Sequence, residues 1–157
     1  MGAFTAFLNE SDVKLVGVEP AGYGLDTQVH LATLTLGKPS QLHGMACYVL
    51  EDEQDEPPLL VHSIASGLDY PGVGPQHSFL KDLGRVEYST ATDQECLVVF
   101  MRLSCVEGIV PTLESSHAVA WTVREAPKMT PDVKIVVNLS GQGDKDSDYV
   151  AEKLGLN

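Results

Sequence analysis

The stretch that most constrains the fold is an apolar run that ends abruptly in a glycine turn, residues 133–146. Residues 133–139 are mostly β-branched, which predicts a strand buried on both faces, as the strands of parallel sheets are. Gly141 and Gly143 allow the backbone to turn sharply and to approach another group closely. Ligands of open α/β sheets bind beyond the carboxyl ends of the strands, so Ser140 is the first side chain at a candidate ligand edge.

An ordinary strand-to-helix connection, with its helix capped by an aspartate, is the alternative interpretation of this turn. The turn contains Gly-x-Gly but lacks the third glycine of a dinucleotide fingerprint, so it is weak support for NAD. Asp144 and Asp146 also argue against a phosphate bound on the turn. A helix is expected to begin at one of these two residues and to end at Gly155. The pattern alone leaves both interpretations open.

Composition narrows the class of protein. The 157 residues are enough for one domain with a core, and the net charge of −12 with only ten Lys and Arg excludes a concentrated basic surface for nucleic acid or an anionic membrane. The three cysteines have no metal-binding spacing and predict free thiols in a reducing compartment. No signal-like or membrane-spanning run is present in the sequence. We therefore expect a cytoplasmic protein, or a plastid protein if a transit peptide lies upstream.

Predicted strands alternate with predicted helices along the chain. Strands are expected at residues 13–18, 42–50, 85–89, 108–113 and 133–139, and helices at 2–9, 76–83, 92–103, 118–124 and from about 144 to Gly155. Residues 27–37 fit a loop or a helix, and the acidic segment 51–58 fits an exposed hairpin tip. This alternation predicts an α/β fold with a mostly parallel sheet flanked by helices.

Polar residues at the ends of three predicted elements could either cap the element or take part in function. Glu19 ends a predicted strand, where a hydrogen-bonded cap is favoured over a ligand contact. Thr92 and Glu95 have the spacing of a capping box. The run from Glu114 to His117 contains an acid, serines and a histidine, but it has no nucleophile elbow, so a catalytic triad is rejected. Caps or ligand contacts are expected there instead.

Five blocks in chain order resemble the C-terminal part of the tryptophan synthase beta family, which are fold-type-II pyridoxal-phosphate enzymes. They are residues 17–20 (GVEP), 68–75 (LDYPGVGP), 107–111 (EGIVP), 113–118 (LESSHA) and 138–146 (NLSGQGDKD). The resemblance covers nearly the whole chain. It implies one partial, cofactor-facing domain at residues 1–157, with the family's N-terminal half and phosphate-binding loop not included.

The resemblance also implies roles for individual residues. Ser140 is similar to the serine that meets the pyridine nitrogen of pyridoxal 5'-phosphate, and Gly141 follows it in the same turn. Glu114 matches a residue beside the cofactor ring, and Gly67 matches a backbone position lining the pocket. Asp69 matches a carboxylate near the leaving hydroxyl of L-serine. Asp69 and Glu114 are thus the expected catalytic residues.

Other positions are implied to bind an ion or a second substrate. The backbone carbonyls of Tyr70 and Gly72 match a monovalent-cation site, and Leu42 and His43 fall where the family lines a tunnel for indole. The implied reaction is that of a lyase that joins L-serine and indole into L-tryptophan and water. The implied partners are an alpha subunit or fused alpha domain, which supplies indole, and a second beta chain in a dimer.

The family's Schiff-base lysine has no counterpart in these 157 residues, so we expect this chain alone to be inactive. The alternative is a truncated, non-catalytic paralogue that acts as a binding or assembly module. Small departures from the family pattern concern the detailed properties of the site and not the resemblance itself. Gln142 replaces an arginine, Ala65 and Ser66 are reversed in order, and Leu31 is bulkier than usual.

Overall fold

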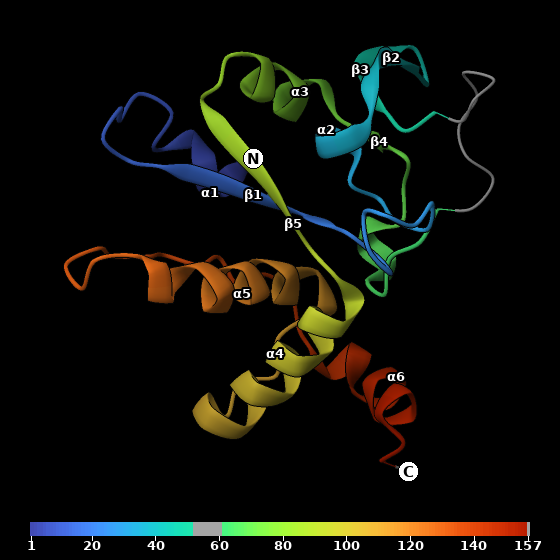
Figure 1. Ribbon diagram of the computed structural model, residues 1–157, viewed down its shortest axis with the longest axis vertical. Helices are drawn as coiled ribbons and strands as arrows, with labels where there is room; N and C mark the ends of the chain where they lie inside the picture. The colour runs from blue at the N-terminus through green and yellow to red at the C-terminus, as the bar shows by residue number, and fades with distance from the viewer. Residues whose placement is uncertain (52–60, 157) are drawn as a thin grey trace.

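The computed structural model describes residues 1–51 and 61–156 (Figure 1). Its strands are β1 (Leu15–Pro20), β2 (Lys38–Leu42), β3 (Met45–Val49), β4 (Gly72–Val73) and β5 (Val86–Ala91). Its α-helices are α1 (Gly2–Thr5), α2 (Thr33–Leu36), α3 (Pro75–Asp82), α4 (Asp93–Glu107), α5 (Leu113–Glu125) and α6 (Asp144–Leu154). Two short 3-10 helices are η1 (Ser66–Leu68) and η2 (Ala126–Lys128). Most of the acidic segment expected as a hairpin tip lies outside the described residues.

A parallel pair of strands forms the centre of the fold. β1 and β5 pair in register from Leu15 opposite Val86 to Pro20 opposite Ala91. Figure 1 shows α5 running across one face of this pair, with α4 packed against α5 below it. The main buried cluster joins the carboxyl end of β5 to α4, α5 and α6, and it includes Ala91, Phe100 and Val150. The predicted α/β class, with a parallel sheet and flanking helices, is confirmed.

A second, antiparallel sheet adds to this frame, with strand order β2-β3-β4. The sequence predicted one strand over residues 42–50, and this was wrong in extent because the chain reverses at His43 and Gly44. These two residues have φ values of 50° and 79°. Positive φ at both central residues is what a two-residue hairpin turn with the right twist requires.

Local capping signals are confirmed at several helix ends. Thr92 and Glu95 form the capping box of α4, with the Thr92 hydroxyl accepting from the Glu95 N–H and the Glu95 carboxylate accepting from the Thr92 N–H. Pro75 begins α3, and Gly155, with φ of 66°, ends α6. These signals act over three or four residues, so they need no tertiary information.

Glu19 is a buried cap, as the sequence favoured. Its Oε1 accepts from the N–H of Leu34 at 2.6 Å, and its Oε2 accepts from the N–H and hydroxyl of Thr35 at 2.9 and 2.8 Å. Burial raises the pKa of the Glu19 carboxyl above its ordinary value, although these hydrogen bonds oppose the rise. The carboxylate therefore fastens the short helix α2 to the end of β1.

Two predicted strands are absent from the described residues. Residues 108–113 are irregular up to Thr112, and α5 starts at Leu113, five residues before the predicted start at Ala118. Residues 133–139 are extended but have no strand partner in the described ranges, and Val136 is 94% exposed. A strand is stabilised by ladder hydrogen bonds and by burial against neighbours, so periodicity alone does not form one.

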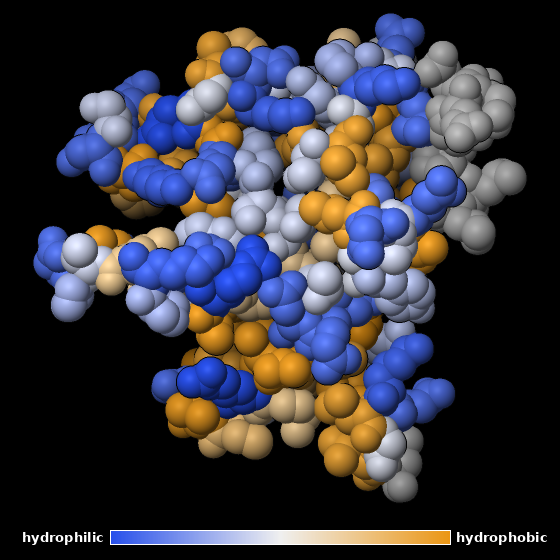
Figure 2. Space-filling view, viewed as in Figure 1, coloured by the Kyte–Doolittle hydropathy of each residue, from blue (hydrophilic) through white to orange (hydrophobic). Residues whose placement is uncertain are grey.

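Apolar side chains remain exposed on the helical part of the molecule. Figure 2 shows hydrophobic residues gathered over the lower part of this face, around α4 and α6. Exposed apolar residues of these two helices include Val98, Val106 and Leu154. Within residues 1–51 and 61–156, no helix combines the length and hydropathy needed to cross a bilayer. An apolar surface of this kind is typical of a region that another part of a protein covers.

Candidate functional site

Ser140 is held at the start of α5 by two hydroxyl side chains. The Ser115 hydroxyl accepts from the Ser140 N–H at 3.0 Å and lies 3.1 Å from the Ser140 carbonyl oxygen. The Thr112 hydroxyl donates to the same carbonyl at 3.1 Å. Thr112 is the N-cap of α5, so the turn after residues 133–139 is attached to a helix N-terminus. The backbone of Ser140 is fixed, while its residue surface is exposed.

Glu114, in the first turn of α5, contacts two segments that are distant in sequence. Its Oε1 accepts from the Gly67 N–H at 3.1 Å, and its Oε2 lies 3.3 Å from the Lys145 ammonium. Partial burial raises the pKa of Glu114, but hydrogen bonds from its own N–H and from Gly67, together with the Lys145 charge, outweigh it and lower the pKa below the ordinary value. Glu114 is therefore an ionised carboxylate at neutral pH.

Lys145 and Asp146 complete this cluster, and sequence reasoning assigned them no such role. The Asp146 Oδ2 accepts from the Leu113 N–H at 3.0 Å, and the Lys145 ammonium lies 2.8 Å from the Asp146 Oδ1. The hydrogen bonds of Lys145 raise its pKa above the ordinary value, with the contact to Asp146 the largest cause. Three charged groups thus join the start of α6 to the start of α5. The sequence signal that could have indicated this cluster is the alternation of negative and positive charge in residues 144–146.

Glycines bring the backbone close to these side chains. A Cβ on Gly67 would lie 2.5 Å from the Glu114 Oε1, and one on Gly141 would lie 2.8 Å from the Thr112 Cγ2. Gly141 also has a φ of 78°, which favours glycine. Larger residues would push the carboxylate or the capping threonine away. Gly67, Glu114, Ser140 and Gly141 therefore form one site edge, which we call the α5 edge.

The other expected site residues lie farther along the same loop as Gly67. Asp69 is the C-cap of η1, is exposed, and makes no side-chain hydrogen bond or ion pair with the part of the chain that the structure describes. The Tyr70 hydroxyl lies 2.9 Å from His43 Nδ1, at the tip of the β2–β3 hairpin. Gly72 pairs with Val49. Asp69 therefore lies two residues after Gly67 of the α5 edge, whereas Tyr70 and Gly72 contact the second sheet.

The α5 edge brings a hydroxyl, a carboxylate and a close backbone approach together. Ser140 offers an exposed hydroxyl, able to donate or accept, on a fixed backbone. Glu114 offers a carboxylate, and Gly67 offers close backbone approach. Gln142 is exposed beside them, whereas Ala65 and Leu31 are buried. These residues fit a planar, hydrogen-bonding cofactor ring. The described residues contain no cluster of three or more His, Cys, Asp or Glu that could hold a metal ion.

The similarity of this chain to known proteins extends over nearly its whole length. No protein-family model matches the chain. It is 49% identical over 156 residues to the tryptophan synthase beta chain of Nitrosomonas europaea. The aligned region is 99% of this chain and 39% of that protein, a C-terminal portion. The chain therefore spans well under half the length of this curated relative.

Proposed function

Because this chain is homologous to a C-terminal portion of the tryptophan synthase beta chain, we propose that it is the cofactor-facing portion of an enzyme of that kind. The observation that carries the proposal is the α5 edge, in which Ser115 fixes the backbone of Ser140 beside the Gly67–Glu114 contact. Glu114 and Ser140 lie in two of the blocks that resemble the family, and Gly67 directly precedes a third.

Pyridoxal phosphate, when bound, supplies an electron sink for replacement at the β-carbon of an amino acid. The Ser140 hydroxyl would contact the ring nitrogen, and as a neutral group it does not force that nitrogen to be protonated. Glu114 would stand beside the ring as a carboxylate, kept ionised by Lys145 and Gly67. Gly67 and Gly141 would let the ring approach the backbone.

Substrate and ion contacts are assigned to the loop after Gly67. The exposed carboxylate of Asp69 would accept a hydrogen bond from the hydroxyl of L-serine, and the carbonyls of Tyr70 and Gly72 would bind a monovalent cation. Residues Leu42 and His43, at the hairpin tip next to Tyr70, would line the path of indole. The product would be L-tryptophan, and indole would come from an alpha subunit or a fused alpha domain.

We assign no complete activity to these 157 residues alone. Each reactive step needs a lysine that anchors the cofactor and moves the substrate's α-proton, and no lysine of this chain lies in the family's lysine motif. Lys145, which contacts the α5 edge through Glu114, is paired with both Glu114 and Asp146. The chain by itself is proposed to be inactive, in the cytoplasm or a plastid.

A fusion protein tests this proposal. Joining the chain to the portion of the Nitrosomonas europaea protein that it does not cover should restore formation of tryptophan from serine and indole. In this fusion, Ser140→Ala should weaken cofactor affinity about fivefold to tenfold, the value of one hydrogen bond. Ser104→Ala is the matched control, because the Ser104 hydroxyl donates to the Phe100 carbonyl within α4. A folded fusion that binds the cofactor and makes no tryptophan would contradict the proposal.

A second candidate, a non-catalytic assembly module, is favoured by the exposed apolar residues of α4 and α6. Such a module would be monodisperse as a 157-residue chain and would unfold cooperatively. A piece of a larger domain would instead aggregate and unfold without cooperativity. Analytical ultracentrifugation together with urea unfolding separates the two candidates.

A further inference from the structure

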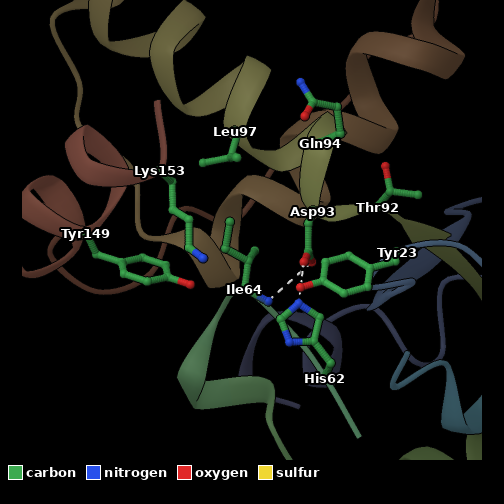
Figure 3. Close-up of a pocket in the computed structure, with 10 residues that line it drawn as sticks. Tyr23, His62, Ile64, Thr92, Asp93, Gln94, Leu97, Tyr149 and Lys153 are labelled. Carbon is green, nitrogen blue, oxygen red and sulfur yellow. Dashed lines mark hydrogen bonds and ion pairs between the residues drawn. The ribbon is translucent and has the colours of Figure 1, made fainter. Parts of the chain in front are cut away.

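A separate cavity of about 310 Å³ lies away from the α5 edge (Figure 3). Its walls come from four segments: the loop after β1, the residues before η1, the first turn of α4, and α6. None of the residues of the α5 edge lines it. Pockets for small molecules begin at about 300 Å³, so this volume suits one compact ligand.

One wall is a rigid polar assembly built on Asp93. Its Oδ2 lies 2.6 Å from the His62 Nε2, and its Oδ1 accepts from the Ile64 N–H at 3.2 Å. The Tyr23 ring packs on the His62 ring, with centroids 4.5 Å apart. Asp93 is also in the first turn of α4, where the helix dipole offsets a negative charge. Both oxygens of this carboxylate are therefore engaged by groups of the protein, which fixes its position in the wall.

The opposite wall is supplied by α6 and carries a positive charge. Tyr149 and Lys153 are four residues apart and so lie on one face of the helix, with the Lys153 ammonium 5.3 Å from the Tyr149 ring centroid. Figure 3 shows the Lys153 ammonium and the hydroxyl ends of Tyr149 and Tyr23 pointing into the same space. Lys153 makes no ion pair with the part of the chain described here. Its charge is available to a ligand.

The base of the cavity is apolar. Ile64 and Leu97 line it and are 7% and 9% exposed, and both belong to the main buried cluster. An apolar base between two tyrosine rings favours a flat hydrocarbon or aromatic body over a sugar. The net charge of −12 disfavours polyanions such as nucleotides, because long-range repulsion grows with ligand charge.

We infer that this cavity binds a small aromatic carboxylate. The ligand's carboxylate pairs with Lys153 and receives hydrogen bonds from the tyrosine hydroxyls, and its ring lies on Ile64 and Leu97 between the tyrosines. This site does not depend on the proposed function, because it shares no residue with the α5 edge. Binding here is a property of α4 and α6 together, so the ligand would also fasten these two helices to each other.

Phenylacetate and its uncharged analogue phenylacetamide test the inference by titration calorimetry on the protein. Phenylacetate should bind with a millimolar or lower dissociation constant, and phenylacetamide at least tenfold more weakly, which is the value of a charge-assisted hydrogen bond. Lys153→Met should remove this difference, and Lys153→Arg should keep it. Lys128→Met is the matched control, because Lys128 pairs with Glu125 at the far end of α5.

A further variant separates this site from the proposed cofactor site. Ser140→Ala should leave phenylacetate affinity unchanged if the ligand binds between α4 and α6. A loss of affinity in Ser140→Ala with none in folded Lys153→Met would overturn the inference, and so would equal binding of the acid and the amide or no binding of either. Circular dichroism of each variant establishes that it is folded. Failure here leaves the fusion experiment unaffected, since that experiment measures tryptophan formation.

Discussion

The hydroxyl of Ser115 contacts both backbone polar groups of Ser140, accepting from its N–H at 3.0 Å and lying 3.1 Å from its carbonyl oxygen. Residues 133–139 have no strand partner in the described part of the chain. The residue that follows them, Ser140, is instead held by a side chain near the start of α5. The position of the Ser140 hydroxyl depends on this contact.

Removing the contact should loosen the turn. Ser115→Ala leaves the Ser140 N–H without its partner, and we expect the free energy of unfolding to fall by about 1–2 kcal/mol. Urea unfolding measures this, with Ser104→Ala as the control within a helix. Equal stability of the two variants would show that Thr112 alone holds the turn.

The capping box of α4 should contribute more to the free energy of unfolding than a hydroxyl in the interior of a helix does. Thr92→Ala removes the acceptor of the Glu95 N–H, and we expect a loss of about 1 kcal/mol. Thr122→Ala is the control, because the Thr122 hydroxyl bonds the Ala118 carbonyl inside α5. That substitution should be neutral or slightly stabilising, since such back-bonding competes weakly with the helix. Thermal unfolding of both variants checks the order.

A side chain at position 67 should displace the Glu114 carboxylate. In Gly67→Ala the new Cβ would lie 2.5 Å from the Glu114 Oε1, so the carboxylate must move and its hydrogen bond to the Gly67 N–H is lost. We expect weaker cofactor binding in the fusion protein by about tenfold and a modest loss of stability. Gly74→Ala is the control, because a Cβ there meets no atom within 4 Å. Equal cofactor affinity in the two variants would contradict the placement of Gly67.

Glu114 should make stability depend on pH in the acidic range. Its pKa is lower in the folded chain than the ordinary value of 4.5, so its contribution is complete above that value and disappears as the pH falls through the folded-state pKa. The difference in unfolding free energy between the parent chain and Glu114→Gln should therefore shrink on acidification. Chemical unfolding at a series of pH values measures it. A difference that is constant with pH would mean that Glu114 carries no such linkage.

Local signals predicted much of the fold. The capping box at Thr92, the proline that starts α3 and the glycine that ends α6 act within one helical turn, so the sequence is sufficient for them. Residues 133–139 show the limit, because an apolar β-branched run becomes a strand only beside a partner. The early start of α5 was missed because its first turn, Glu114 to His117, has the polar composition of a loop.

The resemblance supplied residues of the candidate site but not their contacts, and the roles of these residues stay predictions. Ser140, Glu114 and Gly67 were assigned by resemblance, and the structure brings their segments together. The pairing of Lys145 with Glu114 joins residues 31 positions apart, and nothing in a local pattern specifies such a pair. Asp69 lies in the expected loop, and its role in substrate binding stays a prediction.

The exposure of residues 133–139 has a practical consequence for the isolated chain. Five of its seven residues are valine, isoleucine or leucine, it holds one charge, no proline and no glycine, and its backbone has no ladder partner in the described ranges. Segments of this composition stack with copies of themselves into cross-β fibrils when they are accessible. At high concentration, the 157-residue chain should therefore nucleate amyloid-like aggregates from this segment, and a single Val136→Lys gatekeeper should suppress them.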